Sequence, residues 1–406
     1  MKKIAIFHQE FYFSGGAERL IFEEMGALEK KGYHVEAWAP LAAYDKCFPQ
    51  KIKKFRIYGF LRYLSFIPRE LVILLSCLLA PLLVLRFYDF DLFYGTNQAG
   101  PWFAFLAAKI WRKPYIVFMP YPIGLIYPRK IDRKSGYLQE VPFFIRGLMR
   151  IFKPIIKFLD WQIMTQANTL LTTGDYAKAV FEKIYKREVI NAPSGADPLP
   201  QKLIKSQKRF MGEVEISGKR IKKPYVLITN RPMSKKRFDY MIKGLPKILK
   251  TLPDVRLVVA GDFNDYTREL KRLAEGLGVG EKVIFLGFMD GKNLEKVYLE
   301  AAVYVYTAPE EDYGKGIVEA MAAAIPVVAW NNAGPTGIVL DGKTGYLAKP
   351  FAIEDFAEKV LKLLKNKSLN KKMGEAGRKL VWEKFTQNHH QFIFERQIEG
   401  LLGNRD

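Results

Sequence analysis

Short, largely apolar strands alternate with helical stretches along this chain, and this happens twice, which limits the possible folds more than any other feature. In the first half, the expected strands cover residues 4–7, 35–39, 91–94, 115–119 and 169–173. In the second half, they cover residues 225–229, 255–260, 283–286, 303–306 and 327–329. Continuous apolar strands separated by helices are typical of parallel sheets that helices cover on both faces. The sequence therefore predicts an α/β fold with two doubly wound domains.

The point at which the pattern restarts predicts the domain boundaries. We expect a first domain over residues 1–196 and a second over residues 224–386, joined by residues 197–223. The joining stretch is rich in Lys, Gln, Ser and Gly without clear periodicity, which is typical of a linker. A last helix, within residues 387–406, could cross back to the first domain. Two such domains place a ligand cleft between them, at the carboxyl ends of their strands.

The charge of the chain narrows the choice of partner. A formal net charge of +22 predicts an anionic one; nucleic acid, an acidic membrane surface and phosphorylated small molecules all qualify. The sequence has neither zinc-finger spacing nor the pattern of an RNA-binding module, so we expect no nucleic acid. Two cysteines are too few for a disulfide scaffold. The N-terminus runs directly into a strand and lacks the features of a signal peptide, which favours a cytoplasmic location.

Two glycines, Gly15 and Gly16, stand between the first expected strand and the first expected helix. Glycine lets the backbone approach a ligand closely, and a helix N-terminus offers unpaired N–H groups to an anion. The further glycines of a dinucleotide-binding pattern are missing. A tight turn without a ligand explains the pair equally well.

A basic loop follows the first strand of the second half and contains Arg231 and Lys236. Two cations five residues apart at the carboxyl end of a strand can bracket a diphosphate. The arginine would bind its oxygens as a fork, and the lysine would add a point charge. A solvated basic loop, common in so basic a protein, is the alternative.

Two glutamates, Glu311 and Glu319, give the strongest signal. They flank the start of a helix that follows the strand over residues 303–306. The carboxylates could accept hydrogen bonds from sugar hydroxyls, while the backbone amides of residues 314–317 face a phosphate. Helix capping by acidic residues explains Glu319 but explains Glu311 poorly.

The spacing of these glutamates, with Tyr313-Gly314 between them, resembles the signature of glycosyltransferase family 4, which usually has Phe-Gly there. The resemblance extends over most of the chain, through residues 15–18, Arg231 with Lys236, and residues 341–347. Within the family, the chain is most similar to the GDP-mannose-dependent α-1,3/1,6-mannosyltransferases of dolichol-linked N-glycan precursor assembly.

The resemblance implies a GT-B fold, in which two Rossmann-like domains face each other across a cleft. It also implies retaining transfer of a hexose, with mannose from GDP-mannose as the first choice, to a membrane lipid-linked saccharide. No cofactor and no metal are expected, because fixed cations and helix dipoles would stabilise the leaving nucleotide diphosphate. A UDP-sugar-dependent transferase of polysaccharide or glycolipid synthesis is one alternative. A nucleotide-sugar epimerase or an inactive GT-B scaffold is the other.

The resemblance also assigns roles to single residues. Glu319 would hold the donor ribose and Glu311 the transferred sugar, while Phe288 would lie near the nucleotide base. The expected catalytic residues are Glu311, Arg231 and Lys236. The expected donor-binding residues are Gly15, Gly16, Arg231, Lys236, Phe288, Glu311, Gly314, Lys315, Gly316, Ile317 and Glu319.

The chain departs from the family pattern at several positions. Pro120 stands where many members have a histidine at the active-site end of a strand, and His8 is a candidate substitute. An ordinary loop histidine is the alternative for His8. Arg237 and Gly337 replace a usual glycine and a common glutamate, and residues 261–264 replace a more glycine-rich turn.

Residues 89–91 read Asp-Phe-Asp, which could suggest a metal site. They lie at the entry to a strand, where alternation of side chains between the two faces explains them. We therefore predict no metal there.

The first half also predicts contact with a membrane. Within residues 143–161, four cations recur at helical spacing beside apolar and aromatic residues. The cations are Arg146, Arg150, Lys153 and Lys157. Such a stripe suits a helix that lies on an anionic membrane, which Pro154 would kink or divide into two. Residues 60–67 and 71–85 add apolar surface, although the latter fit a core helix as well. The apolar run over 71–85 is shorter than the roughly 20 residues that span a bilayer.

Overall fold

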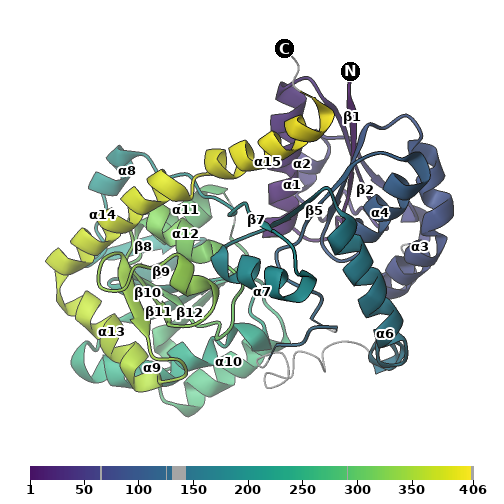
Figure 1. The fold of residues 1–406 in the computed structure, drawn as a ribbon. Helices are drawn as coiled ribbons and strands as arrows, with labels where there is room; N and C mark the ends of the chain where they lie inside the picture. The colour runs from purple at the N-terminus through teal and green to yellow at the C-terminus, as the bar shows by residue number, and fades with distance from the viewer. Residues whose placement is uncertain (65, 125, 130–142, 290, 404–406) are drawn as a thin grey trace. The chain divides into compact units, whose positions relative to one another are not determined.

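The computed structural model of this protein describes residues 1–64, 66–124, 126–129, 143–289 and 291–403 (Figure 1). The chain divides into two compact units. Unit 1 comprises Met1–Tyr127, Phe143–Pro193 and Asn388–Asp406, and unit 2 comprises Pro128–Pro142 and Ser194–Gln387. Each unit is built on a parallel sheet with helices on both faces, so the predicted α/β fold with two Rossmann-like domains is confirmed.

Unit 1 contains a seven-stranded parallel sheet in the order β3-β2-β1-β4-β5-β6-β7. Its strands are β1 Lys3–Phe7, β2 His34–Ala39, β3 Ile57–Gly59, β4 Leu92–Thr96, β5 Tyr115–Phe118, β6 Thr169–Thr172 and β7 Ile190–Asn191. Its α-helices are α1 Gly16–Lys30, α2 Pro49–Ile52, α3 Arg69–Leu83, α4 Gly100–Trp111, α6 Phe143–Gln166, α7 Asp175–Tyr185 and α15 Gln387–Leu402. The short 3-10 helices η1 Arg62–Leu64 and η2 Val84–Phe87 flank α3.

The two faces of the unit 1 sheet bury different helices because successive side chains of a strand point to opposite faces. Ile4 and Ile6 of β1 pack in one core with residues of α1 and α15, whereas Ala5 and Phe7 pack with residues of α3, α4, α6 and α7. Phe394 of α15 is fully buried in the first of these cores. The expected return of the C-terminal helix to the first domain is therefore confirmed.

Unit 2 contains a six-stranded parallel sheet in the order β12-β11-β10-β13-β14-β15. Its strands are β10 Tyr225–Thr229, β11 Arg256–Ala260, β12 Val283–Gly287, β13 Val303–Tyr306, β14 Val327–Trp330 and β15 Gly345–Ala348. Its main helices are α9 Asp239–Thr251, α10 Asp265–Gly276, α11 Gly291–Leu299, α12 Lys315–Ala322, α13 Ile353–Lys365 and α14 Lys367–Lys384. Unit 2 also contains three short 3-10 helices, η4 Ser234–Lys236, η5 Gly280–Lys282 and η6 Gly334–Gly337.

The same alternation divides the unit 2 core. Val303 and Val305 of β13 pack with residues of α9, α10 and α13, whereas Tyr304 and Tyr306 pack with residues of α11 and α12. Two tyrosines therefore lie on the same face of the sheet as the helix that carries Glu319.

The strand order fixes where a ligand can bind within unit 2. Strand β10 pairs with β11 on one side and with β13 on the other, so the connections that follow β10 and β13 leave the sheet in opposite directions. Ligands of doubly wound sheets bind at such a switch point, outside the carboxyl ends of the strands. The loops after β10 and β13 are the ones that contain Lys236 and Glu311.

The structure differs from the linker expected over residues 197–223. This stretch forms α8 Gln201–Lys205 and an antiparallel hairpin of β8 Glu213–Ile216 and β9 Lys219–Lys222, all within unit 2. Ile216 and Ile221 are buried in the unit 2 core. The strands are four residues long and bury every second residue at most, which leaves too little periodicity to detect in a lysine-rich segment.

The two apolar segments of unit 1 form helices. Helix α6 continues through Pro154 without dividing into two. Helix α3 continues as η2, and the stretch Arg69–Phe87 is long and apolar enough to cross a membrane by length and composition alone. Only 28% of that window is buried.

Candidate active site

The loop between β13 and α12 positions both glutamates. Gly314 adopts a left-handed conformation (φ 106°) as the N-cap of α12, which glycine does without strain. Glu311 lies in the loop before this turn, and Glu319 lies in the second turn of the helix. The backbone N–H groups of Lys315 and Gly316 lie in the first turn of α12, where the helix itself offers them no acceptor, so they are available to an anion.

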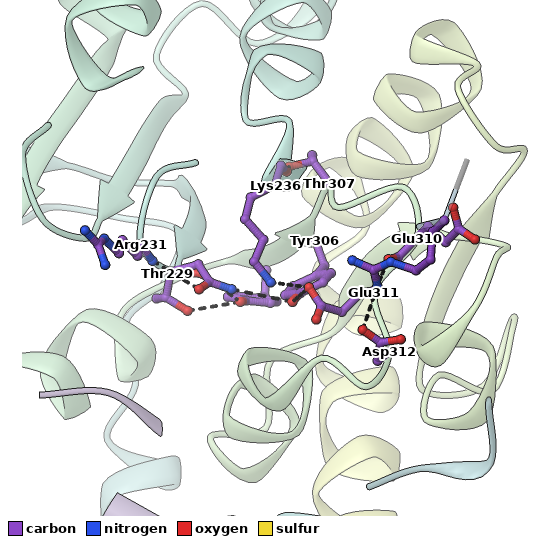
Figure 2. Close-up of polar contacts among 11 residues, drawn as sticks. Thr229, Arg231, Lys236, Tyr306, Thr307, Glu310, Glu311 and Asp312 are labelled. Atoms are coloured by element: carbon purple, nitrogen blue, oxygen red, sulfur yellow. Dashed lines mark hydrogen bonds and ion pairs between the residues drawn. The ribbon is translucent and has the colours of Figure 1, made fainter. Parts of the chain in front are cut away.

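Glu311 is fixed as a carboxylate by two neighbours (Figure 2). The Lys236 ammonium forms an ion pair with Glu311 Oε2, and the Tyr306 hydroxyl donates a hydrogen bond of 2.8 Å to the same oxygen. Burial raises the pKa of Glu311, but Lys236 and Tyr306 more than offset it and lower the pKa to about 2. The side chain is therefore an anionic hydrogen-bond acceptor at neutral pH. It can accept hydrogen bonds from the hydroxyls of a sugar, but it has no proton to donate as a general acid.

Glu319 is oriented by a chain of buried hydroxyls. Tyr298 of α11 donates a hydrogen bond of 2.9 Å to Glu319 Oε2. The Tyr298 hydroxyl also lies 2.6 Å from Thr229 Oγ1, which lies 3.0 Å from the Tyr304 hydroxyl. Burial holds the pKa of Tyr298 well above its usual value, so the hydroxyl remains a donor.

Tyr298, Tyr304 and Tyr306 are not among the site residues predicted from the sequence, although one sequence feature indicates two of them. The alternation in Val303–Tyr306 places Tyr304 and Tyr306 on one face, next to the expected glutamate helix. Gly316 is linked to the same network, because a Cβ atom there would collide with the Tyr304 hydroxyl. This glycine lets α12 pack directly on the hydroxyls, a structural reason additional to any phosphate contact.

The basic loop after β10 brings Lys236, but not Arg231, to Glu311. Figure 2 shows Arg231 at one end of the group, away from Glu311, whereas the Lys236 side chain points toward Glu311. Arg231 is exposed. Arg237 adopts a left-handed conformation (φ 51°), which explains why a glycine is usual at this place. Its guanidinium pairs with Asp239 at 2.8 Å and so fastens the loop to the start of α9.

Two exposed aromatic side chains lie just after the carboxyl ends of neighbouring strands of the unit 2 sheet. Phe288 follows β12, as expected for a residue near the base, and is half-exposed. Phe263 follows β11, is also exposed, and packs against Gly287 closely enough that a Cβ atom there would lie 2.8 Å from its ring. Phe263 lies in the turn that departs from the family pattern, a signal that we did not use.

The glycine turn of unit 1 is held by a carboxylate. Gly15 is the N-cap of α1, and its N–H donates a hydrogen bond of 3.1 Å to Glu18 Oε2. His8 Nε2 lies 3.6 Å from Glu18 Oε1, and the His8 side chain is 1% exposed. His8 is thus a buried neighbour of the residue that supports the turn, an arrangement that fits the ordinary loop histidine better than a group open to an acceptor. Pro120 follows β5 as expected.

The aspartates of residues 89–91 are engaged by lysines. Asp91 accepts hydrogen bonds from the Lys3 backbone at 2.8 Å and from Lys2 Nζ at 3.1 Å, and Asp89 pairs with Lys3 Nζ. These contacts tie the entry of β4 to the start of β1.

Comparison with known proteins tests the resemblance. Residues 213–380 match the family model described as glycosyl transferases group 1. The chain is 24% identical over 427 residues to human alpha-1,3/1,6-mannosyltransferase ALG2, covering 96% of this chain and 94% of that protein. It is 32% identical over 163 residues to the GDP-mannose-dependent alpha-(1-6)-phosphatidylinositol monomannoside mannosyltransferase of Mycolicibacterium smegmatis, covering 38% and 42% of the two chains.

Among solved structures, Anabaena HepE in complex with UDP and glucose is similar over 99% of this chain and 100% of its own, with a TM-score of 0.73 and 17% identity. This likeness confirms the GT-B fold. The matched family region contains Lys236, both glutamates and their tyrosines, which are the residues that the structure gathers at the switch point of unit 2. Residues 213–380 of this chain therefore carry a glycosyl transferases group 1 domain.

Proposed function

We propose that this chain is a retaining transferase that moves a hexose, with mannose from GDP-mannose as the first choice, to a lipid-linked saccharide at a membrane surface. One observation carries the donor side of the proposal. Glu311 is held as a carboxylate by Lys236 and Tyr306, beside the N-terminus of α12 and at the switch point of the sheet. An anion for sugar hydroxyls, a cation and helix amides for phosphates are thereby close together.

The proposed reaction uses these groups in separate roles. Glu319 holds the ribose and Glu311 the hexose, while Lys236, Arg231 and the first amides of α12 bind the diphosphate. The bond between the anomeric carbon and the phosphate oxygen breaks, and its electron pair leaves with the diphosphate. The acceptor oxygen bonds to the anomeric carbon on the same face, and its proton passes to a donor phosphate oxygen. Fixed cations and amides stabilise the departing charge, so the proposal requires no metal.

Donor choice rests on the relatives. ALG2 and the mycobacterial enzyme are named as mannosyltransferases, the latter GDP-mannose-dependent, which supports GDP-mannose. The UDP and glucose bound to HepE support the alternative of a UDP-sugar.

Thermal unfolding with a panel of GDP, UDP, GDP-mannose and UDP-glucose separates these donors. A ligand at 100 times its dissociation constant stabilises a protein by about 2.7 kcal/mol. We expect GDP and GDP-mannose to raise the melting temperature. A response to the UDP ligands alone would favour the alternative donor, and no response to any of the four would contradict a nucleotide-sugar enzyme.

The membrane part of the proposal rests on α6 and α3. Ile151, Ile155 and Phe158 of α6 are exposed, and Lys153 and Lys157 of the same helix are exposed among them. Apolar side chains interleaved with cations suit the boundary between lipid head groups and acyl chains.

Helix α3 adds a second apolar surface. Leu78 is 71% exposed and Leu82 is 67% exposed, whereas Val72, Ser76 and Ala80 are buried. A soluble core helix would bury such leucines, so their exposure supports surface attachment over the core-helix alternative.

Co-sedimentation with vesicles tests this attachment. We expect the protein to pellet with phosphatidylserine-containing vesicles at low salt and to be released by high salt or detergent. If the protein remains in the supernatant at low salt, the proposed membrane attachment is wrong.

A further inference from the structure

Arg129 reaches the loop that carries Glu311, although 181 residues separate it from Glu310. Its Nη1 donates hydrogen bonds to the Glu310 carbonyl oxygen at 2.9 Å and to Asp312 Oδ2 at 2.6 Å. These two acceptors belong to the residues directly before and after Glu311. A single guanidinium therefore holds the chain on both sides of the proposed sugar ligand.

The buried carboxylate of Asp312 explains why the loop needs the contact with Arg129. Its side chain is buried, with the residue only 5% exposed, and it neighbours the carboxylate of Glu311. Burial and the Glu311 charge raise the pKa of Asp312 to about 7, against the opposing effect of Arg129, Lys236 and Lys235. A buried carboxylate beside another carboxylate destabilises a loop unless a cation compensates for it.

The segment that follows β14 makes two further contacts with the same loop. Gly334 N–H donates to the Glu311 carbonyl oxygen at 2.7 Å, and Asn332 Nδ2 donates to the Pro309 carbonyl oxygen at 2.7 Å. Both bind main-chain atoms and leave the Asp312 charge unchanged. Among the contacts that the structure describes, the closest cation to Asp312 is Arg129.

We propose that Arg129 is a positioning residue of the donor site, which holds Glu311 in contact with Lys236 and Tyr306 by neutralising Asp312 and binding the Glu310 carbonyl. The inference rests on the proposed function in one respect, namely that Glu311 binds the donor sugar. Because the guanidinium makes two hydrogen bonds in fixed geometry, a lysine is a poor substitute.

Turnover of four variants tests the charge relation. We expect Arg129→Ala to lower kcat by about tenfold to a hundredfold, as a misplaced reacting group does, with less than about threefold change in the dissociation constant of free GDP or UDP. Arg129→Lys should fall in between. At a pH above the pKa of Asp312, where its carboxyl is ionised, Asp312→Asn introduced into Arg129→Ala should restore kcat to within about fivefold of wild type, because no buried charge then remains unpaired. Arg268→Ala is the matched control, since Arg268 pairs with Asp265 on an exposed surface.

Hydrogen exchange of the amides of residues 310–314 gives a second readout that does not depend on turnover. We expect faster exchange in Arg129→Ala and recovery in the double variant. If Arg129→Ala leaves both kcat and exchange as in wild type, the inference is wrong. If the double variant exchanges as wild type but recovers no activity, Arg129 contacts the substrate directly and is not a positioning residue.

The two failures can be distinguished. If wild type transfers no sugar from any nucleotide-sugar, the proposed function fails, while the exchange of residues 310–314 still decides whether Arg129 holds the loop. If Arg129→Ala does not fold, Arg129→Lys and Arg129→Lys with Asp312→Asn provide the same comparison.

Discussion

The two units share one architecture and differ in what they expose. In unit 1, large apolar side chains are exposed in series along α3 and α6, including Leu78, Leu82, Ile155 and Phe158. In unit 2, the exposed large apolar side chains of the described residues are scattered over separate elements, as Phe263, Phe288 and Trp382 are. The same doubly wound plan thus presents an apolar surface in one unit and, by our proposal, a polar ligand site in the other.

The loops that follow the first strand of each sheet differ in a similar way. Strand β1 lies between β2 and β4, as β10 lies between β11 and β13, so both loops lie at switch points. After β1, Glu18 is used internally, to hold the glycine turn. After β10, Lys236 reaches across to Glu311 on another loop. Equivalent positions in the sheet therefore serve support in one unit and, by our proposal, chemistry in the other.

The largest effect should come from the glutamates of unit 2. We expect Glu311→Ala to lower kcat by roughly a hundredfold to a thousandfold with little change in the affinity for free nucleotide, because an interaction with the sugar in the transition state is lost. Glu319→Ala should instead weaken nucleotide binding. Calorimetric titration and steady-state kinetics measure the two effects, with exposed Glu269 changed to alanine as control. Equal and negligible effects would contradict the assignment.

The pH dependence of stability should isolate Asp312. Burial raises its pKa from 3.8 to about 7, so the folded state binds the proton more tightly than the unfolded state. The resulting stabilisation is present below about pH 4 and is lost as the pH rises through about 7. The free energy of unfolding of wild type relative to Asp312→Asn should therefore fall by no more than roughly 4 kcal/mol between pH 4 and pH 8.

Denaturant unfolding at pH 4, 6 and 8 measures this difference. Asp265→Asn is the control, because Asp265 is exposed. A difference between wild type and Asp312→Asn that does not change with pH would show that Asp312 does not titrate in this range.

The apolar surface of unit 1 should be separable from the donor site. We expect Ile155→Asp with Phe158→Asp to weaken vesicle binding by roughly tenfold to a hundredfold, because two apolar side chains no longer enter the membrane. The stabilisation by nucleotide should be unchanged. Trp382→Asp, at an exposed aromatic residue of unit 2, should leave vesicle binding as in wild type. Comparable losses in both variants would remove the contrast between the units.

The smallest effects should distinguish the tyrosines. Tyr298→Phe removes the hydrogen bond to Glu319 and should weaken nucleotide binding by roughly threefold to tenfold, about 1 kcal/mol for one hydrogen bond. Tyr306→Phe removes the bond to Glu311 and should lower kcat by a similar factor without affecting nucleotide binding. The same titrations and kinetics apply, and the reverse pattern would exchange the roles of the two glutamates.

The sequence by itself determined the repeating α/β pattern, the strand-end positions of Lys236 and Glu311, and the helix that begins after Gly314. These features follow from short-range rules. Side chains alternate between the two faces of a strand, and few residues other than glycine tolerate a left-handed backbone conformation at the cap of a helix. The return of the last helix was expected only as a possibility, because periodicity shows which face of a helix is apolar and not what covers it.

Only the tertiary structure decided the partners of the buried polar groups. Tyr298 meets Glu319 across 21 residues, Arg129 meets Asp312 across 183, and His390 meets Glu24 across 366 at 2.9 Å. Each buried charge or hydroxyl needs a partner, but many side chains of the sequence could supply it. The order of the strands and the packing of the helices select one, and local sequence patterns carry no record of that choice.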